Sequence, residues 1–298
     1  MMSPYQSEAL KILFSAVVRQ NVTPEVWNWL NDTVAQTNNS QQFNIAFVSV
    51  PRKTGKSLIH VTQDQEKTLR KECAGLIIAS WTIDRLCRVW LLAGLSSADK
   101  TQYFQTIENL FLTAEVNELV ALYSALPVLA YPEMWSKRCA EGIRSNIGAA
   151  LEAIMCYNPY PAAYLDEQAC NQLVLKAFFT GKPVEQIIGL DIRANAALAK
   201  TLSDYAHERW AANRTVHPQI WRCTGKFIDK DIFPDMERLA HSENALDREA
   251  AALACADSSY PPAQELINTL PDIKSAIASG ELNWNVLAEK IKNYVLQS

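Results

Sequence analysis

The residues best suited to chemistry lie between Tyr157 and Arg222, where cations and amides interrupt faces made of Leu, Phe, Tyr and Ala. Lys176 and Gln172 point the same way, one turn apart, on a predicted helix over 163–180 that is otherwise apolar all round. Burying a charge without a partner costs several kcal/mol, so such a lysine needs a counter-ion, a hydrogen-bond network or a ligand. The pattern predicts a polar site inside an α-helical body.

Arg209 repeats this pattern on the next predicted helix, 193–213, where it lies in the middle of the apolar face. Glu208 projects at one edge of that face, and Asp204 sits further round. We predict that Lys176 and Arg209 are secluded together in the apolar interior and contact a bound anion. Either carboxylate would neutralise the two cations when the site is empty.

Further polar side chains complete the candidate ligand site. They are amides that would orient a ligand by hydrogen bonds, together with residues that flank an apolar stripe or supply further cations: Gln172, Asn171, Asn158, Arg144, Asn146, Arg214 and Arg222. Structural interpretations stay open beside this one. Lys176 can belong to an ion pair that fixes helix register, and the turn at Asn158-Pro159 can be a rigid corner.

The sequence predicts neither a metal nor a cofactor. Asp204-x-x-His207 resembles one metal-binding pair of a helical bundle, but no second such pair supplies the matching carboxylates. The Thr-Gly-Lys-Ser run at 54–57 follows no glycine-rich turn, since the position where a phosphate loop needs its first glycine is Val50. Seven cysteines without a CxxC pair indicate buried thiols in a reducing compartment.

Composition bounds the fold and the partners. Only 9 of the 298 residues are glycine, which favours helices over barrels or sandwiches. A formal net charge of −4 argues against nucleic acid, because binding a phosphate backbone needs a basic surface. No apolar run approaches the roughly 18 residues of a spanning helix, and the N-terminus lacks the basic start of a signal peptide. We expect a cytoplasmic protein that does not span a membrane.

Apolar periodicity predicts helices along the whole chain, including three long ones over 64–93, 99–126 and 133–156. Segment 43–50 is either a strand or a buried helix. Short helices joined by proline-marked turns in the last third suggest a HEAT-like α-solenoid of stacked helical hairpins, in a single continuous all-α body. Its predicted parts are N-terminal helices in 1–132, a signature core in 133–223 and C-terminal helical pairs in 224–298.

Several runs, in order along most of the chain, resemble the EboA-domain family. They are FNIAFVSVPRKTGK (43–56), GIRSNIGAALEAIMCYNPYP (142–161), NQLVLKAFFTGKPVEQIIGLDIRAN (171–195), DYAHERWAANR (204–214) and IWRC (220–223). The resemblance implies a cytoplasmic protein encoded in a bacterial gene cluster beside a UbiA-like prenyltransferase and a TatD-like hydrolase. Such clusters are associated with making small-molecule natural products or moving them toward the periplasm.

The resemblance transfers motif positions without catalytic roles. The polar positions that it marks are Arg144, Asn146, Asn158, Asn171, Gln172, Lys176, Asp191, Asn195, Asp204, Glu208, Arg209, Arg214 and Arg222. Our first hypothesis is a non-catalytic binding or scaffold protein that holds a pathway intermediate or a partner enzyme of the cluster. Its pocket would lie between the helices ending near 156, 180 and 213.

Two other functions stay open. The chain can be a metal-independent enzyme in which Lys176 is a base or Schiff-base nucleophile, or works with Glu208 as an acid–base pair. Alternatively, the charged residues form a structural ion network in an adaptor whose outer surface does the binding.

Overall fold

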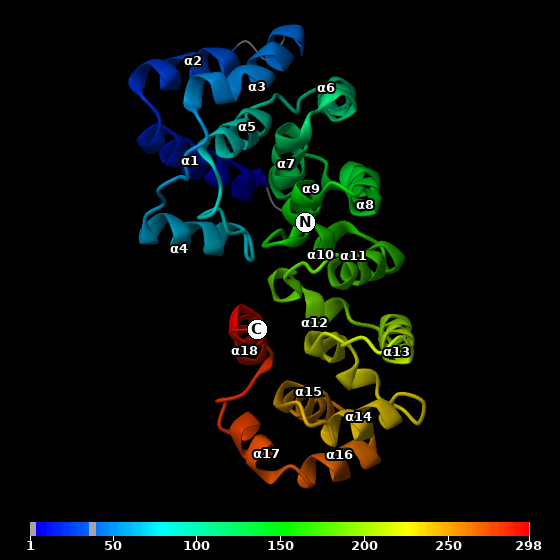
Figure 1. The fold of residues 1–298 in the computed structure, drawn as a ribbon. Coiled ribbons are helices and arrows are strands. Elements are labelled where there is room, and N and C mark those ends of the chain that lie inside the picture. The colour runs from blue at the N-terminus through cyan, green and yellow to red at the C-terminus, as the bar shows by residue number, and fades with distance from the viewer. Residues whose placement is uncertain (1–3, 36–39, 298) are drawn as a thin grey trace. The chain divides into compact units, whose positions relative to one another are not determined.

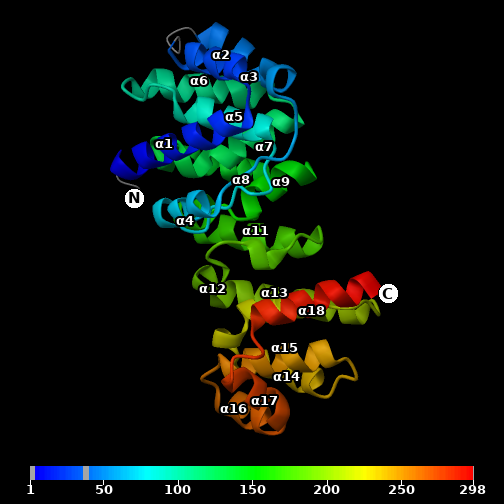
Figure 2. The same ribbon diagram turned by 90° about the vertical axis from the view of Figure 1, so that its left-hand side faces the viewer.

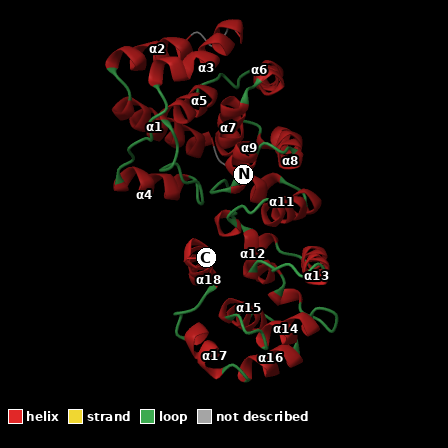
Figure 3. Cartoon of the chain, in the orientation of Figure 1, coloured by secondary structure: helices red, strands yellow, loops and turns green. Residues whose placement is uncertain are grey.

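A computed structural model describes residues 4–35 and 40–297, and the regular elements of these residues are all helical (Figures 1 and 3). The one exception is an isolated β-bridge between Leu58 and Thr82. The predicted all-α fold is therefore confirmed. The chain divides into two compact units, Met1–Asp166 and Glu167–Ser298, which are described separately below.

The first unit is built around α5 (Ile83–Ala93), which packs against α1, α3 and α7. Its other elements are α1 (Pro4–Asn21), α2 (Pro24–Ala35), α3 (Ser40–Thr54), α4 (Gln63–Glu72), α6 (Lys100–Thr113), α7 (Val116–Ala125), η1 (Leu126–Val128), η2 (Pro132–Trp135), α8 (Ser136–Arg144), α9 (Gly148–Met155) and α10 (Tyr160–Tyr164). Every residue of α5 except Arg85 is buried. A helix enclosed on all sides explains why its sequence, IDRLCRVWLLA, is apolar in nearly every direction.

The second unit is organised around α15 (Ala245–Ala256), which packs against α14, α16, α17, α18, η4 and η5. Its other elements are α11 (Glu167–Phe179), η3 (Val184–Gln186), α12 (Leu190–Arg193), α13 (Ala196–Ala211), η4 (Pro218–Cys223), η5 (Gly225–Phe227), α14 (Phe233–Ala240), α16 (Pro261–Asn268), α17 (Pro271–Ala278) and α18 (Trp284–Gln297). In Figures 1 and 2, α15 lies between α18 and the α16–α17 pair. The alanines of the buried run 250–255 let these neighbours approach closely.

The three long predicted helices are wrong, because each is interrupted. The predicted helix over 64–93 splits into α4 and α5 where Gly75 adopts a left-handed φ of 89°. Residues 99–126 split into α6 and α7 where Glu115 forms a new N-terminal capping box with Glu118. Residues 133–156 divide among η2, α8 and α9, with extended backbone at Ser145 and Ile147.

Other expectations concern finer detail. Segment 43–50, for which strand and helix were both open, lies inside α3. The HEAT-like repeat and the single continuous body stay predictions, as do the internal boundaries at 132 and 223. None of the helices in the described residues combines the length and the apolar composition that a membrane span requires.

Candidate functional site

A groove of about 690 Å³ opens in the second unit, between helices that are distant in sequence. It is lined by residues of α11, α13, α14, α15 and α18, and of the segment that leads into η4: Phe178, Tyr205, Arg209, Trp210, Asn213, Arg214, Thr215, Val216, His217, Pro218, Arg238, Leu239, Asn244, Leu246, Asp247, Ile291 and Tyr294. Its volume falls in the range of sites for small organic ligands.

The turn after α13 places two arginines on this groove. Asn213 adopts a left-handed φ of 54°, a conformation that asparagine tolerates better than most residues. The backbone N–H of Arg214 then donates to the carbonyl of Arg209 at 2.9 Å, which closes the helix end. The Nε of Arg209 donates to the carbonyl of Thr215 at 2.7 Å. The guanidinium of Arg209 is thereby held over the turn.

A third arginine reaches the groove from α14. The guanidinium carbon of Arg238 lies 4.2 Å from the centre of the Trp210 ring, close enough for a cation–π contact. Trp210 in turn stacks on the buried Trp221, with ring centres 5.9 Å apart and planes inclined by 21°. Arg238 therefore rests on an aromatic base that is anchored in the core.

The three arginines leave the groove electropositive. Among the described residues, no carboxylate forms an ion pair with Arg209, Arg214 or Arg238. Of the described residues on the lining, Asp247 alone carries a carboxylate, which accepts a hydrogen bond from Ser242 at 2.9 Å. Burial raises the pKa of Asp247, while the Ser242 hydrogen bond and the charge of Arg248 oppose that rise.

His217 adds a neutral polar group to the lining. Loss of hydration around the ring lowers its pKa, with a smaller opposing effect from Glu185, although part of the residue remains exposed. The backbone N–H of Gln219 donates to its Nδ1 at 3.3 Å, so the proton of the neutral ring lies on Nε2. The His217 ring also lies 5.9 Å from that of Phe178, at an angle of 56°.

Residues 10–225 match the model of the family described as metabolite traffic protein EboA. The chain belongs to the EboA family. No curated protein and no solved structure matches it.

The groove of this EboA protein extends past the matched region. Arg209 and Arg214 lie inside residues 10–225, whereas Arg238, Asp247 and Tyr294 follow it in the sequence. Helices C-terminal to the family match therefore supply part of the lining.

The expectation that Lys176 and Arg209 are secluded in an apolar interior is wrong. Both residues are half-buried, and Gln172, which shares the direction of Lys176, is exposed. Arg209 lines the groove, which opens to solvent, and Lys176 does not belong to the lining. The helices ending near 180 and 213 do border the groove, but the helix ending near 156 belongs to the first unit.

The predicted amides have structural partners. Asn171 and Asn195 exchange hydrogen bonds of 2.9 and 3.2 Å between their side-chain amides, and Asn195 also accepts from the N–H of Leu198 as the N-cap of α13. Asn158, in the first unit, is 3% exposed and donates to the carbonyls of Tyr123 and Ala153. These geometries favour the rigid-corner interpretation of Asn158.

Replacing Asn158 with alanine should lower the free energy of unfolding by about 2–3 kcal/mol, because two carbonyls and the N–H of Tyr160 lose their buried partner. Chemical denaturation would measure the change. Asn117→Ala, at an exposed position of α7, is the matched control and should change stability by less than about 0.5 kcal/mol. A destabilisation no larger than that of the control would contradict the corner role.

The remaining predicted site residues lie on surfaces or in ion pairs. Asp204 pairs with Lys200 at 3.6 Å on the exposed side of α13, and Glu208 is exposed. Arg144 and Asn146 are exposed in the first unit.

Arg222 forms two hydrogen bonds of 2.6 and 2.7 Å with Asp191, beside a separate cavity of about 230 Å³.

The sequence did not lead us to predict a polar cluster that joins α13 to α14. Asp235 of α14 is 3% exposed and accepts a hydrogen bond from Ser203 at 2.6 Å. Its other oxygen lies 2.6 Å from Nε2 of His207, whose side chain is otherwise half exposed to solvent. Ser203 and His207 are four residues apart, the spacing that aligns two side chains on one helical face. This spacing was the available signal.

A buried ion cluster in the first unit was also missed. Arg88 is 2% exposed and contacts Asp84 at 3.0 Å and Glu118 at 3.6 Å, while its Nε donates to the carbonyl of Phe47. Burial lowers the pKa of Arg88, and the two carboxylates oppose that shift. The cluster ties α5 to α3 and α7 and lies outside the groove.

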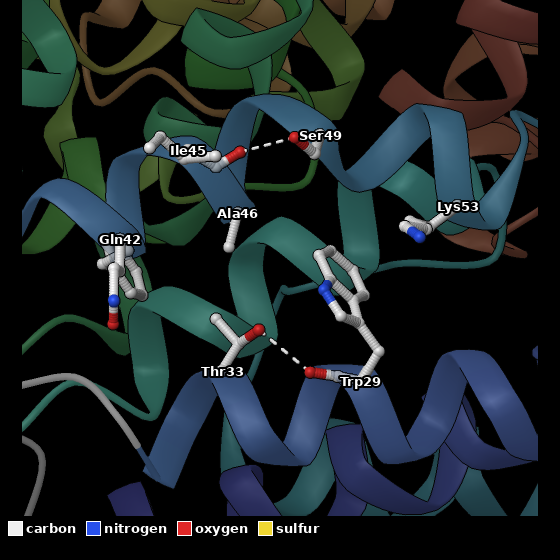
Figure 4. A pocket seen from close by; sticks show the side chains of 8 residues that line it. Trp29, Thr33, Gln42, Ile45, Ala46, Ser49 and Lys53 are labelled. Atoms are coloured by element: carbon white, nitrogen blue, oxygen red, sulfur yellow. Dashed lines mark hydrogen bonds between the residues drawn. The ribbon is translucent and has the colours of Figure 1, made fainter.

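A second, smaller cavity of about 280 Å³ lies between α2 and α3 of the first unit (Figure 4). Among the residues of its lining that the structure describes, Lys53 alone is charged, with Nζ 5.9 Å from the centre of the Trp29 ring. Figure 4 shows the hydroxyls of Thr33 and Ser49 turned to backbone carbonyls of their own helices. This cavity therefore offers fewer groups for a polar ligand than the groove does.

Proposed function

We propose that this EboA-family chain is a non-catalytic binding protein that holds a small anionic metabolite in the groove of its second unit. The observation that carries the proposal is the set of three groove arginines without an ion-pair partner among the described residues. Other arginines, such as Arg88 and Arg222, have carboxylates beside them. Unpaired cations gathered on a groove in a chain of net charge −4 favour an anionic ligand.

The family description supports a role in metabolite handling. A binding protein in a biosynthesis or export pathway needs to exclude water only in part and to release its ligand, which suits an open groove. We place this role in the cytoplasm, with other proteins of the same gene cluster as partners. We expect Arg209 and Arg214 to contact the ligand, together with Arg238, which lines the same groove.

Mass spectrometry of small molecules released from the purified full chain tests the proposal. Wild-type protein should release an anionic compound in near-stoichiometric amount. The double variant Arg209→Gln, Arg214→Gln should release at least about tenfold less of this compound than wild type, because each charge-assisted hydrogen bond contributes roughly 1.5–3 kcal/mol. Lys200→Gln removes a cation from the exposed side of the same helix and is the matched control. Equal amounts from all three proteins, or no compound from any, would contradict a groove ligand.

The enzymatic alternative that uses Lys176 with Glu208 stays a prediction, and neither side chain belongs to the groove lining. Borohydride trapping of a Schiff base at Lys176 with carbonyl substrates is its test. The adaptor alternative also stays a prediction.

A further inference from the structure

Two kinds of side chain meet in the groove of the second unit. Its cations are Arg209, Arg214 and Arg238, and its aromatic rings come from three helices: Phe178 on α11, Tyr205 and Trp210 on α13, and Tyr294 on α18. We propose that the groove selects a planar aromatic molecule with an anionic group attached to or close to its ring system. This inference rests on the proposed function and names the chemical class of its ligand.

The cations and the rings are neighbours in space. The guanidinium of Arg238 lies 4.2 Å from the Trp210 ring centre, and that of Arg209 lies 5.9 Å from the Tyr205 ring centre. An anion that binds the N–H groups of either arginine is therefore within a few ångströms of an aromatic side chain. A ligand ring directly beside the anionic group reaches these side chains, whereas a long spacer carries the ring past them.

The aromatic side chains of the groove are only partly covered by other groups of the protein. Tyr294 is 61% exposed, and Tyr205 is half-buried with its ring 4.9 Å from that of the exposed Phe179. Rings left in water gain free energy when a flat apolar partner covers them. Offset or edge contacts between aromatic rings add attraction beyond that of the buried area, which favours an aromatic ligand over a saturated one.

The size of the groove argues against a simple inorganic anion. A volume of about 690 Å³ leaves most of the space, and all four aromatic side chains, unused when phosphate or sulfate alone binds the arginines. The carboxylate of Asp247 lies on the same lining and repels a second anionic group there. One anionic group on an otherwise apolar ring system fits these constraints.

Calorimetric titration of the full chain with a matched pair of carboxylates tests the proposal. The probes are naphthalene-2-carboxylate and its ring-saturated counterpart, decahydronaphthalene-2-carboxylate. We expect the aromatic probe to bind about fivefold more tightly, the ratio that corresponds to a ring contact of roughly 1 kcal/mol. Inorganic phosphate should bind more weakly than both. Equal affinities of the two carboxylates, or no measurable binding of either, would overturn the proposal.

Variants assign the preference to the groove. Tyr205→Leu and Tyr294→Leu should each reduce the ratio between the two affinities. Tyr294 is largely exposed, so its replacement leaves the packing of the core intact. The control is Tyr260→Leu. The ring of Tyr260 packs on Phe233 and does not belong to the lining, so this variant should keep the wild-type ratio. A ratio that survives both groove substitutions would also overturn the proposal.

The arginine double variant separates this inference from the proposed function. Arg209→Gln, Arg214→Gln should weaken both carboxylates at least about tenfold, whatever the ring preference. If that loss is observed but the two probes bind equally, the aromatic class is wrong while the anion site stands. If the double variant binds both probes as tightly as wild type, the proposed function itself fails.

Discussion

Replacing Arg88 with methionine should lower the free energy of unfolding by about 3–5 kcal/mol, because the change leaves Asp84 and Glu118 buried without their counter-ion. Methionine fills much of the same space, so the loss comes from the charges rather than from a cavity. The carbonyl of Phe47 also loses its donor. Urea denaturation followed by circular dichroism would measure the change.

Two comparisons isolate the buried charges as the cause. Arg70→Met removes an exposed arginine whose nearest carboxylate, on Glu66, lies 3.9 Å away, and should cost less than about 1 kcal/mol. The triple variant Asp84→Leu, Arg88→Met, Glu118→Leu removes all three charges and should recover much of the lost stability. If the single variant unfolds at the same urea concentration as wild type, the cluster does not hold α5 in the way we describe.

The helical class of the fold was predictable from local features of the sequence. Apolar residues at helical spacing act over one or two turns, and the low glycine content of the whole chain favours helices throughout. The interruptions were harder to predict. The extended backbone at Ser145 and Ile147 lies in the run Ser145-Asn146-Ile147-Gly148, a short turn signal that the apolar periodicity on both sides masks.

The candidate site was only partly predictable. Arg209 and Arg214 were identified because they interrupt or follow an apolar helical face, and the structure places both on the groove. Arg238 and Tyr294 could not be assigned to the same place, since they meet Arg209 only through tertiary packing of helices far apart in sequence. No local pattern encodes such a meeting.

A charged residue among apolar neighbours forms a buried ion pair where the whole helix is enclosed, as α5 is. Lys176 lies on a helix whose other residues include the exposed Gln172 and Phe179, so an apolar composition did not mean burial. In α5, Asp84 and Arg88 are four residues apart among neighbours that are apolar in nearly every direction, which is the stricter form of the same signal. That form predicts a buried ion pair, as the structure shows.

Replacing Gly225 with alanine should lower the free energy of unfolding by about 3 kcal/mol. A Cβ at this position would lie 2.7 Å from the backbone oxygen of Ala254 and 3.0 Å from the Cβ of Asp257, at the C-terminal end of α15. Backbone atoms cannot turn aside as a side-chain tip does, so η5 and α15 must move apart. Thermal and urea denaturation would measure the loss.

Gly181→Ala is the matched comparison, because it tests the effect of backbone conformation without a steric clash. Gly181 has a left-handed φ of 63° and no atom within 4 Å of an added Cβ, so alanine there meets backbone strain alone and should cost about 1 kcal/mol. Gly225 has no such φ, and its larger expected loss comes from the contact with α15. Similar losses for the two variants would show that η5 and α15 tolerate separation.

The contact between Gly225 and α15 should also affect ligand binding in the groove. Gly225 is the last residue of the family match, and α15, which packs against it, carries Leu246 and Asp247 of the lining. Displacing α15 from η5 moves that wall relative to Arg209 and Arg214 on the other side. We therefore expect Gly225→Ala to weaken naphthalene-2-carboxylate binding at temperatures where the variant is still folded, whereas Gly181→Ala keeps wild-type affinity. Unchanged affinity in a folded Gly225→Ala protein would mean that the C-terminal helices keep their place on the groove without this contact.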